Sequence, residues 1–260
     1  MSEGEPLVVD ALQGRASYPS LRNKRVLITG GGSGIGAGIV EGFVRQGSKV
    51  TFFDIAEEEA RALVGQLGGA PRFEKVDLTH TAHLRSTIAE LIAEEGAFDI
   101  LVNNAGNDDR HAISDVTEAY WDERMQVNLK HLFFCAQSVI PGMREKGGAI
   151  INLGSISWHL ALPELTLYQT AKAGIEGLTR SLARELGPDN IRATCVVPGN
   201  VRTPRQLQWY TPEGEAEIIA AQCLKGRLAP EDIAAMVMFL ASDDARLITG
   251  HSFFVDAGWR

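Results

Sequence analysis

A chain of 260 residues, 45% hydrophobic and 22% charged, is long enough to build one α/β domain around its own core. Its net charge of −8 argues against binding to the phosphate backbone of nucleic acids, and no stretch approaches the roughly 20 apolar residues of a membrane span. The three cysteines are widely spaced and form no Cys-x-x-Cys pair, so neither a disulfide framework nor a thiolate metal site is predicted. A reducing, cytoplasmic location is expected.

Short β-branched runs alternate with longer amphipathic segments along the chain. We predict strands at 25–29, 49–53, 100–103, 149–153, 191–197 and 252–255, with a weaker strand at 72–76. This alternation predicts right-handed βαβ crossovers and a mostly parallel, doubly wound sheet of the Rossmann type. We expect one domain at 21–260, preceded by a flexible arm at 1–20, and the longest segment that fits no strand is 200–226.

A glycine-rich loop follows the first predicted strand and leads into a helical pattern at 37–46. Glycines in such a strand, turn and helix unit let the backbone approach a pyrophosphate, whose charge is met by the amides and dipole of the helix. The spacing is Gly-x-x-x-Gly-x-Gly, for which an ordinary turn is the alternative, but the position after a strand favours a dinucleotide site. The candidate cofactor-binding residues are Gly30, Ser33, Gly34, Ile35 and Gly36.

The second predicted strand leads to Asp54, about 20 residues past the loop, where a carboxylate can accept both hydroxyls of an adenosine ribose. Neither Ser33 nor Ile55 is basic, so the 2′-phosphate of NADP would meet like charge without a counterion, and we predict NAD. A plain turn residue at the strand end is the alternative for Asp54. Asp77, with Leu78 beside it, is a weaker candidate for the adenine edge and could equally cap the following helix.

Tyr168 and Lys172 would lie one turn apart on the same face of a helix. A neighbouring cation favours the phenolate of a tyrosine, whose ordinary pKa is near 10, and so makes it a usable base for alcohol oxidation. Ser155, thirteen residues upstream of Tyr168, adds a hydroxyl that can donate to a substrate oxygen. The Tyr-x-x-x-Lys spacing also occurs by chance, so its meaning depends on the rest of the chain.

Six motifs in order resemble the short-chain dehydrogenase/reductase family over residues 21–260. They are the glycine loop, Asn103-Asn104-Ala105-Gly106, Asn128, Ser155, the Tyr168/Lys172 pair and Pro198-Gly199. The resemblance implies an NAD-dependent dehydrogenase with Asn128, Ser155, Tyr168 and Lys172 as catalytic residues. It implies that Lys172 lowers the pKa of Tyr168 and that Asn128 joins Lys172 through water in a proton relay.

The same resemblance assigns further residues to the cofactor and to the assembly. Its cofactor-binding residues would be Asn104, Ala105, Gly106, Tyr168, Lys172, Pro198, Gly199, Val201 and Thr203, with Asn104 at a ribose and the last two at the carboxamide. Residues 200–226, with Arg205, Trp209 and Tyr210, would form a substrate lid. A homotetramer with 117–143, expected as one long helix, and 252–260 at its interfaces is also implied.

Two polar segments flank the predicted site, one at 107–111 and one at 156–159. Many donors and acceptors together with an indole suit a sugar better than a steroid or an acyl chain, although solvated loops are the alternative. The segments resemble those of bacterial sugar 1-dehydrogenases, which implies oxidation of the anomeric hydroxyl of an aldose to a lactone. D-xylose leads, with galactose, arabinose, fucose or a non-sugar secondary alcohol as alternatives, and a non-catalytic NAD-binding regulator is a remote one. The predicted substrate residues are Asn107, Asp109, Ser155, Trp158, His159, Tyr168, Asn200 and Arg205.

A few other histidines, cysteines and aromatic residues are expected to have a structural or surface role. His80 and His83 are predicted at the surface, and no metal is required. Cys135 and Cys195 are predicted to be small core residues, and the pair at 133–134 is predicted to lie in the core as well.

Overall fold

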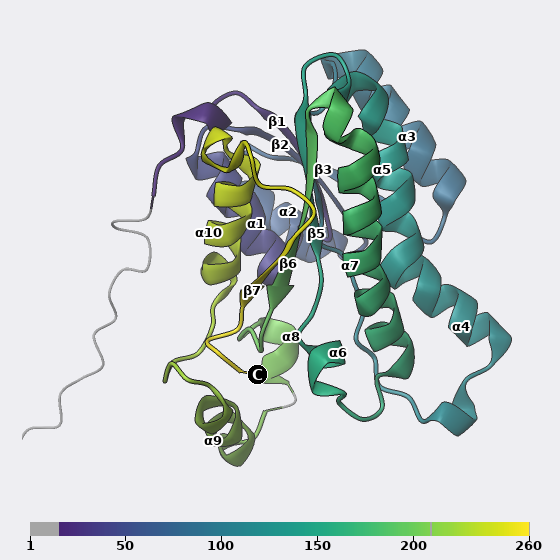
Figure 1. Cartoon of the computed structure of the whole chain (residues 1–260), viewed down its shortest axis with the longest axis vertical. Helices are drawn as coiled ribbons and strands as arrows, with labels where there is room; N and C mark the ends of the chain where they lie inside the picture. Colours follow the sequence, from purple (N-terminus) through teal and green to yellow (C-terminus); the bar gives the residue numbers. More distant parts are fainter. Residues whose placement is uncertain (1–15, 209, 260) are drawn as a thin grey trace, which may run out of the picture.

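A single parallel sheet is the centre of the computed structural model, which describes residues 16–208 and 210–259 (Figure 1). Within that part of the chain the strand order is β3-β2-β1-β4-β5-β6-β7. The strands are β1 (Arg25–Thr29), β2 (Lys49–Asp54), β3 (Arg72–Lys75), β4 (Ile100–Asn103), β5 (Gly148–Leu153), β6 (Ile191–Pro198) and β7 (Ser252–Val255). The predicted doubly wound sheet is confirmed, and each strand boundary lies within one residue of its predicted position.

Helices cover both faces of this sheet (Figure 1). On one face lie α1 (Gly34–Arg45), α2 (Glu57–Gln66) and α10 (Pro230–Ala241), and on the other lie α3 (Thr81–Glu95), α5 (His131–Met143) and α7 (Thr166–Leu186). The remaining helices are α4 (Glu118–Met125), α6 (Ser157–Leu160), α8 (Pro204–Leu207) and α9 (Pro212–Ala221). None of the helices in the described residues combines the length and the apolar character that a membrane span needs.

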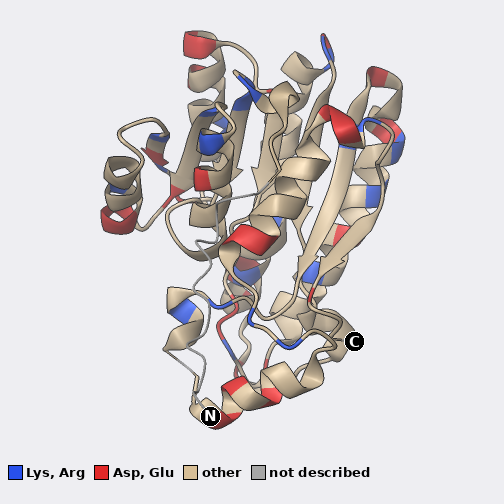
Figure 2. Cartoon of the chain, turned by 90° about the vertical axis from the view of Figure 1, so that its left-hand side faces the viewer, with Lys and Arg blue, Asp and Glu red and all other residues tan. Residues whose placement is uncertain are grey.

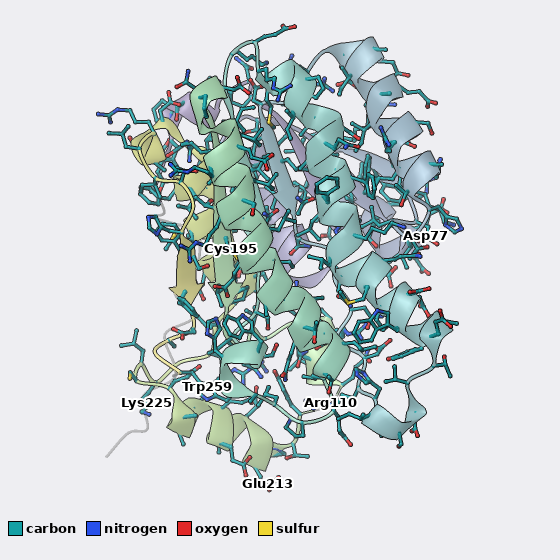
Figure 3. All side chains as sticks on the ribbon, turned by 45° about the vertical axis from the view of Figure 1, so that its right-hand side comes forward. Asp77, Arg110, Cys195, Glu213, Lys225 and Trp259 are labelled. Atoms are coloured by element: carbon teal, nitrogen blue, oxygen red, sulfur yellow. The ribbon has the colours of Figure 1, made fainter. Side chains whose placement is uncertain are left out.

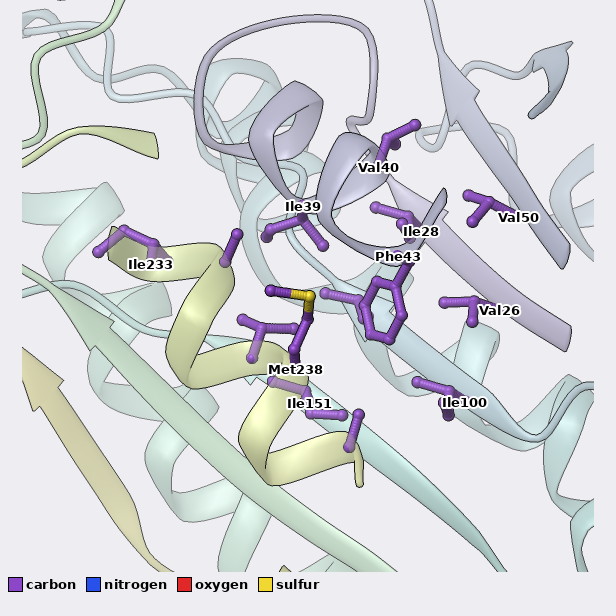
Figure 4. Packing of buried hydrophobic residues seen from close by; sticks show 14 of the residues in the cluster. Val26, Ile28, Ile39, Val40, Phe43, Val50, Ile100, Ile151, Ile233 and Met238 are labelled. Atoms are coloured by element: carbon purple, nitrogen blue, oxygen red, sulfur yellow. The ribbon is translucent and has the colours of Figure 1, made fainter. Parts of the chain in front are cut away.

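The core is divided in two by the sheet because side chains of a strand alternate between its faces. In β1, which is buried throughout, Val26 belongs to the cluster beneath α1 and α10, and Leu27 belongs to the cluster beneath α3, α5 and α7. Phe43 of α1 and Met238 of α10 meet over the first face (Figure 4). Full burial of one such side chain stabilises the fold by about 1.5–3 kcal/mol. The buried side chains on the two faces therefore hold both helix layers firmly against the sheet.

The carboxyl ends of the central strands lie in register. Thr29 of β1 pairs with Asn103 of β4, and Asn103 pairs with Asn152 of β5. Sequence order reverses between β1 and its neighbour β4, and at such a switch point the loops leave the sheet in opposite directions and open a crevice. The loops that carry the predicted motifs therefore begin side by side.

The predicted long helix at 117–143 is interrupted. After α4 ends, residues Gln126–Lys130 form a π-helical turn, and α5 begins at His131. Asn128 lies fully buried within this turn. A π turn places five residues where an α-helix has four, which a pattern of apolar residues does not reveal, and such turns often occur at functional sites.

Burial bears on three expectations about side chains outside the site. Cys135 and Cys195 are fully buried, as predicted, and His80 and His83 are exposed, as predicted. Phe133 is 44% exposed, so its assignment to the core is wrong. The reason is geometric, because consecutive helical residues point about 100° apart and Phe133 takes the outward direction on α5.

The predicted arm lies outside the described residues up to residue 15, as do Trp209 of the predicted lid and Arg260 of the predicted interface. Residues 16–20 pack on the domain. The Tyr18 amide donates to Gln46 Oε1 at 2.8 Å, and Gln46 Nε2 donates to the Ala16 carbonyl at 3.0 Å.

Candidate active site

A cavity of about 550 Å³ lies outside the carboxyl ends of the central strands. It brings together most of the residues that sequence motifs pointed to, from segments up to 175 residues apart (Gly30 to Arg205). The predicted residues that line it are Gly30, Ser33, Gly34, Ile35, Gly36, Asp54, Ile55, Asp77, Leu78, Asn104, Ala105, Gly106, Asn107, Ser155, Tyr168, Lys172, Pro198, Gly199, Asn200, Val201, Thr203 and Arg205. Four predicted residues, Asn128, Asp109, Trp158 and His159, do not line it.

The glycine loop forms one wall of the cavity and leaves room for an anion. A Cβ on Gly36 would lie 1.8 Å from the Gly30 carbonyl oxygen, so no larger residue fits this turn. Ser33 occupies the N-cap of α1 without a side-chain capping bond, and the first turn carries no acidic residue. The amides of that turn are therefore left for a ligand, and together with the helix dipole they fit a pyrophosphate.

Asp54 is held rigidly at the end of β2. Its Oδ2 accepts a hydrogen bond from the Gly32 amide at 2.7 Å, and its Oδ1 accepts from the amides of Ile55 and Ala56 at 2.8 and 2.9 Å. Such charge-assisted bonds fix the carboxylate at one end of the cavity. The position is compatible with the predicted ribose contact, which stays a prediction.

Asp77 adds a second carboxylate to the same end of the cavity. Its Oδ1 accepts from the Thr79 amide at 2.9 Å and from the Thr79 hydroxyl at 2.7 Å. The alternative that Asp77 caps the following helix is wrong, because α3 begins at Thr81 and His80 occupies its N-cap. The carboxylate instead turns the chain before the helix.

Ser155, Tyr168 and Lys172 meet at the middle of the cavity. Lys172 Nζ donates to the Leu153 carbonyl at 2.8 Å and lies 5.4 Å from the centroid of the Tyr168 ring. Ser155 Oγ accepts from the Ser157 amide at 3.1 Å and donates to the Ser157 hydroxyl at 2.9 Å. The end of β5 and one face of α7 thus present a hydroxyl, a phenol and an ammonium to the same space.

Asn128 lies behind the cavity wall. Its Oδ1 accepts from the Asn107 amide at 2.7 Å, and its Nδ2 donates to the Asn107 carbonyl at 3.0 Å. A Cβ on Gly106 would lie 3.2 Å from Asn128 Oδ1 and 3.4 Å from Lys172 Nζ, so both groups surround Gly106. The π turn therefore places the Asn128 side chain against the backbone of the loop after β4, next to Lys172.

The electrostatics of the pair differ from the expectation. Desolvation raises the pKa of Tyr168 above its ordinary value and the charge of Asp108 adds to this, whereas hydrogen bonding with Ser155 and the charge of Arg205 act in the opposite direction. Burial lowers the pKa of Lys172 to about 8. The pKa of Tyr168 is therefore not lowered overall in this structure, because desolvation outweighs the neighbouring charges, and the contribution of Lys172 itself stays a prediction.

Trp158 and His159 are turned away from the cavity. Trp158 Nε1 donates to Glu176 Oε1 at 2.9 Å, and His159 Nε2 lies 3.0 Å from the same oxygen. The two rings are stacked with centroids 3.7 Å apart, and His159 also contacts Phe254 at 4.8 Å. Burial against α7 and β7 thus takes the place of the predicted contact with a sugar.

Asp109 is also engaged elsewhere, as part of an ion-pair network that joins the predicted lid to the loop after β4. Arg205 of α8 donates to Asp109 Oδ1 at 2.6 Å and to Asp108 Oδ1 at 3.1 Å, and the buried Arg124 of α4 donates to Asp109 Oδ2 at 3.1 Å. Figure 2 shows acidic and basic residues at the end of the molecule that holds the C terminus. These bonds hold α8 over the mouth of the cavity.

Several lining residues were not among the predicted site residues, although Asp108 and Arg110 belong to the polar segment at 107–111. They are Asp108, Arg110, Leu160, Leu162, Leu165, Gln206 and Trp259. Trp259 comes from the far end of the chain, and Figure 3 shows it at the same end of the molecule as Arg110. The amides of Cys223 and Leu224 both donate to the Ala257 carbonyl at 3.0 Å, which fixes this tail against the segment after α9.

His131 follows the π turn and is 1% exposed. Burial, with a contribution from the charge of Lys172, lowers the pKa of His131 from 6.5 to about 3. Between pH 6.5 and about pH 3 the imidazole of His131 binds a proton in the unfolded chain but not in the folded chain. The contribution of His131 to the free energy of unfolding is therefore fully present above about pH 6.5 and is lost as the pH falls toward 3.

We therefore expect acidification to destabilise the wild-type protein more than the H131Q variant, by about 3 kcal/mol between roughly pH 7 and roughly pH 4. Urea unfolding at several pH values measures the difference. H83Q, at an exposed histidine, is the control and should follow the wild type. Equal pH dependence of the wild type and H131Q would contradict the prediction.

No group of three or more His, Cys, Asp or Glu side chains within residues 16–208 and 210–259 is arranged to hold a metal ion. The described residues of the cavity present a hydroxyl, a phenol, an ammonium and the loop amides.

Comparison with known proteins places this geometry among dehydrogenases. A family model described as enoyl-(acyl carrier protein) reductase matches residues 30–260. The chain is 64% identical over 249 residues to the D-xylose 1-dehydrogenase of Caulobacter vibrioides, with 94% of this chain and 99% of the relative covered. A probable galactose dehydrogenase of Rhizobium meliloti is 47% identical, with 94% and 97% covered. The ligand-free structure of an aldohexose dehydrogenase from Thermoplasma acidophilum is 29% identical and superposes with a TM-score of 0.84, with 94% and 96% covered.

Proposed function

The chain belongs to the short-chain dehydrogenase/reductase family, and from this premise we propose that it oxidises the anomeric hydroxyl of an aldose, D-xylose first, to the aldonolactone with NAD as hydride acceptor. The observation that carries the proposal is one continuous cavity. Ser155, Tyr168 and Lys172 line it together with Asp54 after β2 and Asn200 after β6. The sheet order sets the last two on opposite sides of the catalytic groups, which leaves a place for a dinucleotide and a place for a small substrate.

The sugar side of the cavity combines polar and aromatic surface. Asn107, Asn200 and Arg205 offer hydrogen-bonding groups, and Trp259 offers an aromatic face for the C–H surface of a pyranose. Trp259 thus takes the place that the sequence assigns to Trp158. The names of the relatives support a sugar as the substrate class, and the 64% identity favours D-xylose over galactose.

The catalytic residues act on the substrate oxygen. Ser155 donates a hydrogen bond to it, and the phenolate of Tyr168, formed once the phenol has lost its own proton to solvent, accepts the proton of the anomeric hydroxyl. Lys172, held by the Leu153 carbonyl, supplies positive charge beside the tyrosine, and Asn128 fixes the loop that carries Asn107. NAD, when bound, supplies the acceptor for the hydride. The glycine loop and Asp54 would hold it at one end of the cavity, and Asn104, Val201 and Thr203, which also line the cavity, would hold its nicotinamide half.

NADH formation from a panel of pentoses and hexoses tests the proposal. We expect activity with NAD and the highest kcat/KM for D-xylose. Activity confined to non-sugar secondary alcohols would contradict the sugar assignment. Binding of NAD without turnover of any alcohol would favour a regulatory protein.

In this proposal Asp54 is the residue that determines the preference for NAD over NADP. Asp54 and Asp77 lie at the same end of the cavity, and that end has no basic lining residue in the described part of the chain. We expect D54N to lower kcat/KM for NAD roughly tenfold to a hundredfold through weaker bonds to the ribose, and to narrow the preference over NADP. E59Q, which removes the same charge from an exposed position on α2, should leave both values unchanged. Equal use of NAD and NADP by the wild type would contradict the prediction.

We further propose a cytoplasmic homotetramer. Trp121 of α4 and Phe133 of α5 are each 44% exposed, which supports an interface on this pair of helices. The three cysteines are unpaired, as expected in a reducing compartment. Light scattering measures the assembly state.

A further inference from the structure

Glu176 joins three elements around the catalytic groups. It lies on α7, one turn after Lys172, and its side chain is 17% exposed. Oε1 accepts from Trp158 Nε1 at 2.9 Å and contacts His159 Nε2 at 3.0 Å, and both of these residues belong to α6. Oε2 accepts from the Ser252 hydroxyl of β7 at 2.8 Å. A single carboxylate thus ties α6 and β7 to the helix that carries Tyr168 and Lys172.

The helix α6 needs such an anchor because it has only four residues and follows Ser155 almost directly. A helix this short has no stability of its own in water. Ala161 and Glu164, just beyond it, have φ values of 51° and 61°, a conformation that costs non-glycine residues about 1–3 kcal/mol each unless contacts hold them. Tertiary contacts must therefore set the orientation of α6.

That orientation determines what the substrate meets. Ile156, Ser157 and Leu160 line the cavity, whereas Trp158 and His159 do not. Ser157 also holds the Ser155 hydroxyl through its amide and its own hydroxyl. A rotation of α6 would therefore displace the Ser155 hydroxyl together with the apolar side chains of Ile156 and Leu160 that line the cavity.

We propose that Glu176 is a positioning residue. Through its contacts with Trp158 and His159 it fixes the orientation of α6, and α6 in turn orients the Ser155 hydroxyl and the Leu160 side chain toward the substrate. The inference rests on the proposed function and adds a residue that no motif marks. Glu176 does not line the cavity, so it would contact neither the substrate nor NAD directly. Its loss should therefore lower substrate turnover through a displaced Ser155 hydroxyl and leave the affinity for NAD unchanged.

The test compares E176A, E176Q and S252A. In E176A we expect kcat with the preferred aldose to fall about tenfold to a hundredfold and its KM to rise, with the Kd for NAD unchanged. E176Q should recover most of the activity, because its amide oxygen can accept from Trp158 and His159 while its NH₂ group donates to Ser252. S252A, which keeps both bonds to α6, should resemble the wild type.

Wild-type kcat in E176A, or equal impairment of E176A and E176Q, would overturn the role of Glu176, as would a parallel loss of NAD affinity. If E176A does not fold, W158F provides the test, since it keeps an aromatic ring and removes one of the two donors; an unchanged kcat there would also overturn the proposal. The wild-type sugar screen separates the two hypotheses. No NADH from any aldose would overturn the proposed function, whereas an active wild type with an equally active E176A would overturn only the positioning role.

Discussion

Replacement of Tyr168 by phenylalanine is expected to reduce aldose turnover by about a hundredfold to ten-thousandfold, the range that general acid–base groups contribute. Phenylalanine keeps the ring and removes the phenol oxygen, which takes up the substrate proton after it has lost its own. Because desolvation raises the pKa of Tyr168, the side chain is neutral near pH 7, so the substitution removes no charge from the cavity. The Kd for NAD should therefore stay close to the wild-type value. Steady-state kinetics and calorimetric titration with NAD measure the two effects.

Y18F is the matched control for this substitution. Tyr18 lies on the packed segment before β1 and does not line the cavity, so loss of its hydroxyl should leave kcat unchanged. Near-normal turnover in Y168F would remove Tyr168 from the mechanism. A parallel loss of NAD affinity would show instead that the hydroxyl serves binding and not proton transfer.

Substitution of Lys172 by methionine is expected to lower kcat by at least about a hundredfold and to leave the protein as stable as the wild type or more so. Burial lowers the pKa of Lys172 from 10.5 to about 8, so the folded chain holds this ammonium at pH 7 at a cost of roughly 3 kcal/mol. Methionine removes that cost. It also leaves the Leu153 carbonyl without its donor, which costs about 1–3 kcal/mol, so the two effects nearly balance.

Differential scanning calorimetry in the absence of NAD measures the stability, and NADH formation measures the activity. K49M, which removes an exposed ammonium at the start of β2, is the control for the loss of one positive charge. A large decrease in Tm for K172M would show that the ammonium stabilises the fold. Wild-type turnover in K172M would contradict the catalytic role.

Local patterns predicted the parts of the site that depend on neighbouring residues. Tyr168 and Lys172 share a face because they are one helical turn apart, and α7 places both at the cavity. The glycine loop follows β1 and Asp54 ends β2, so their positions at the carboxyl edge follow from the strand pattern and the crossover rule.

Patterns of this kind could not predict the direction of side chains on irregular segments. The indole at Trp158 was expected at the sugar because it follows Ser155 closely, yet Glu176 of α7 holds it on the opposite side. Trp259 lines the cavity only because the C-terminal tail packs against the segment after α9. The π turn at Asn128 likewise reflects the bonds that its side chain makes to Asn107.

The sequence by itself determined the order of strands and helices, the cofactor loop and the spacing of the catalytic pair, because apolar periodicity and turn residues act over a few residues of the chain. Only the tertiary structure decided which aromatic residue faces the cavity, how α6 is anchored and in which direction the pKa of Tyr168 moves. These features depend on burial and on contacts between residues far apart in the chain, such as Glu176 with Ser252 or Tyr168 with Asp108, and their energies exist only once the elements have packed.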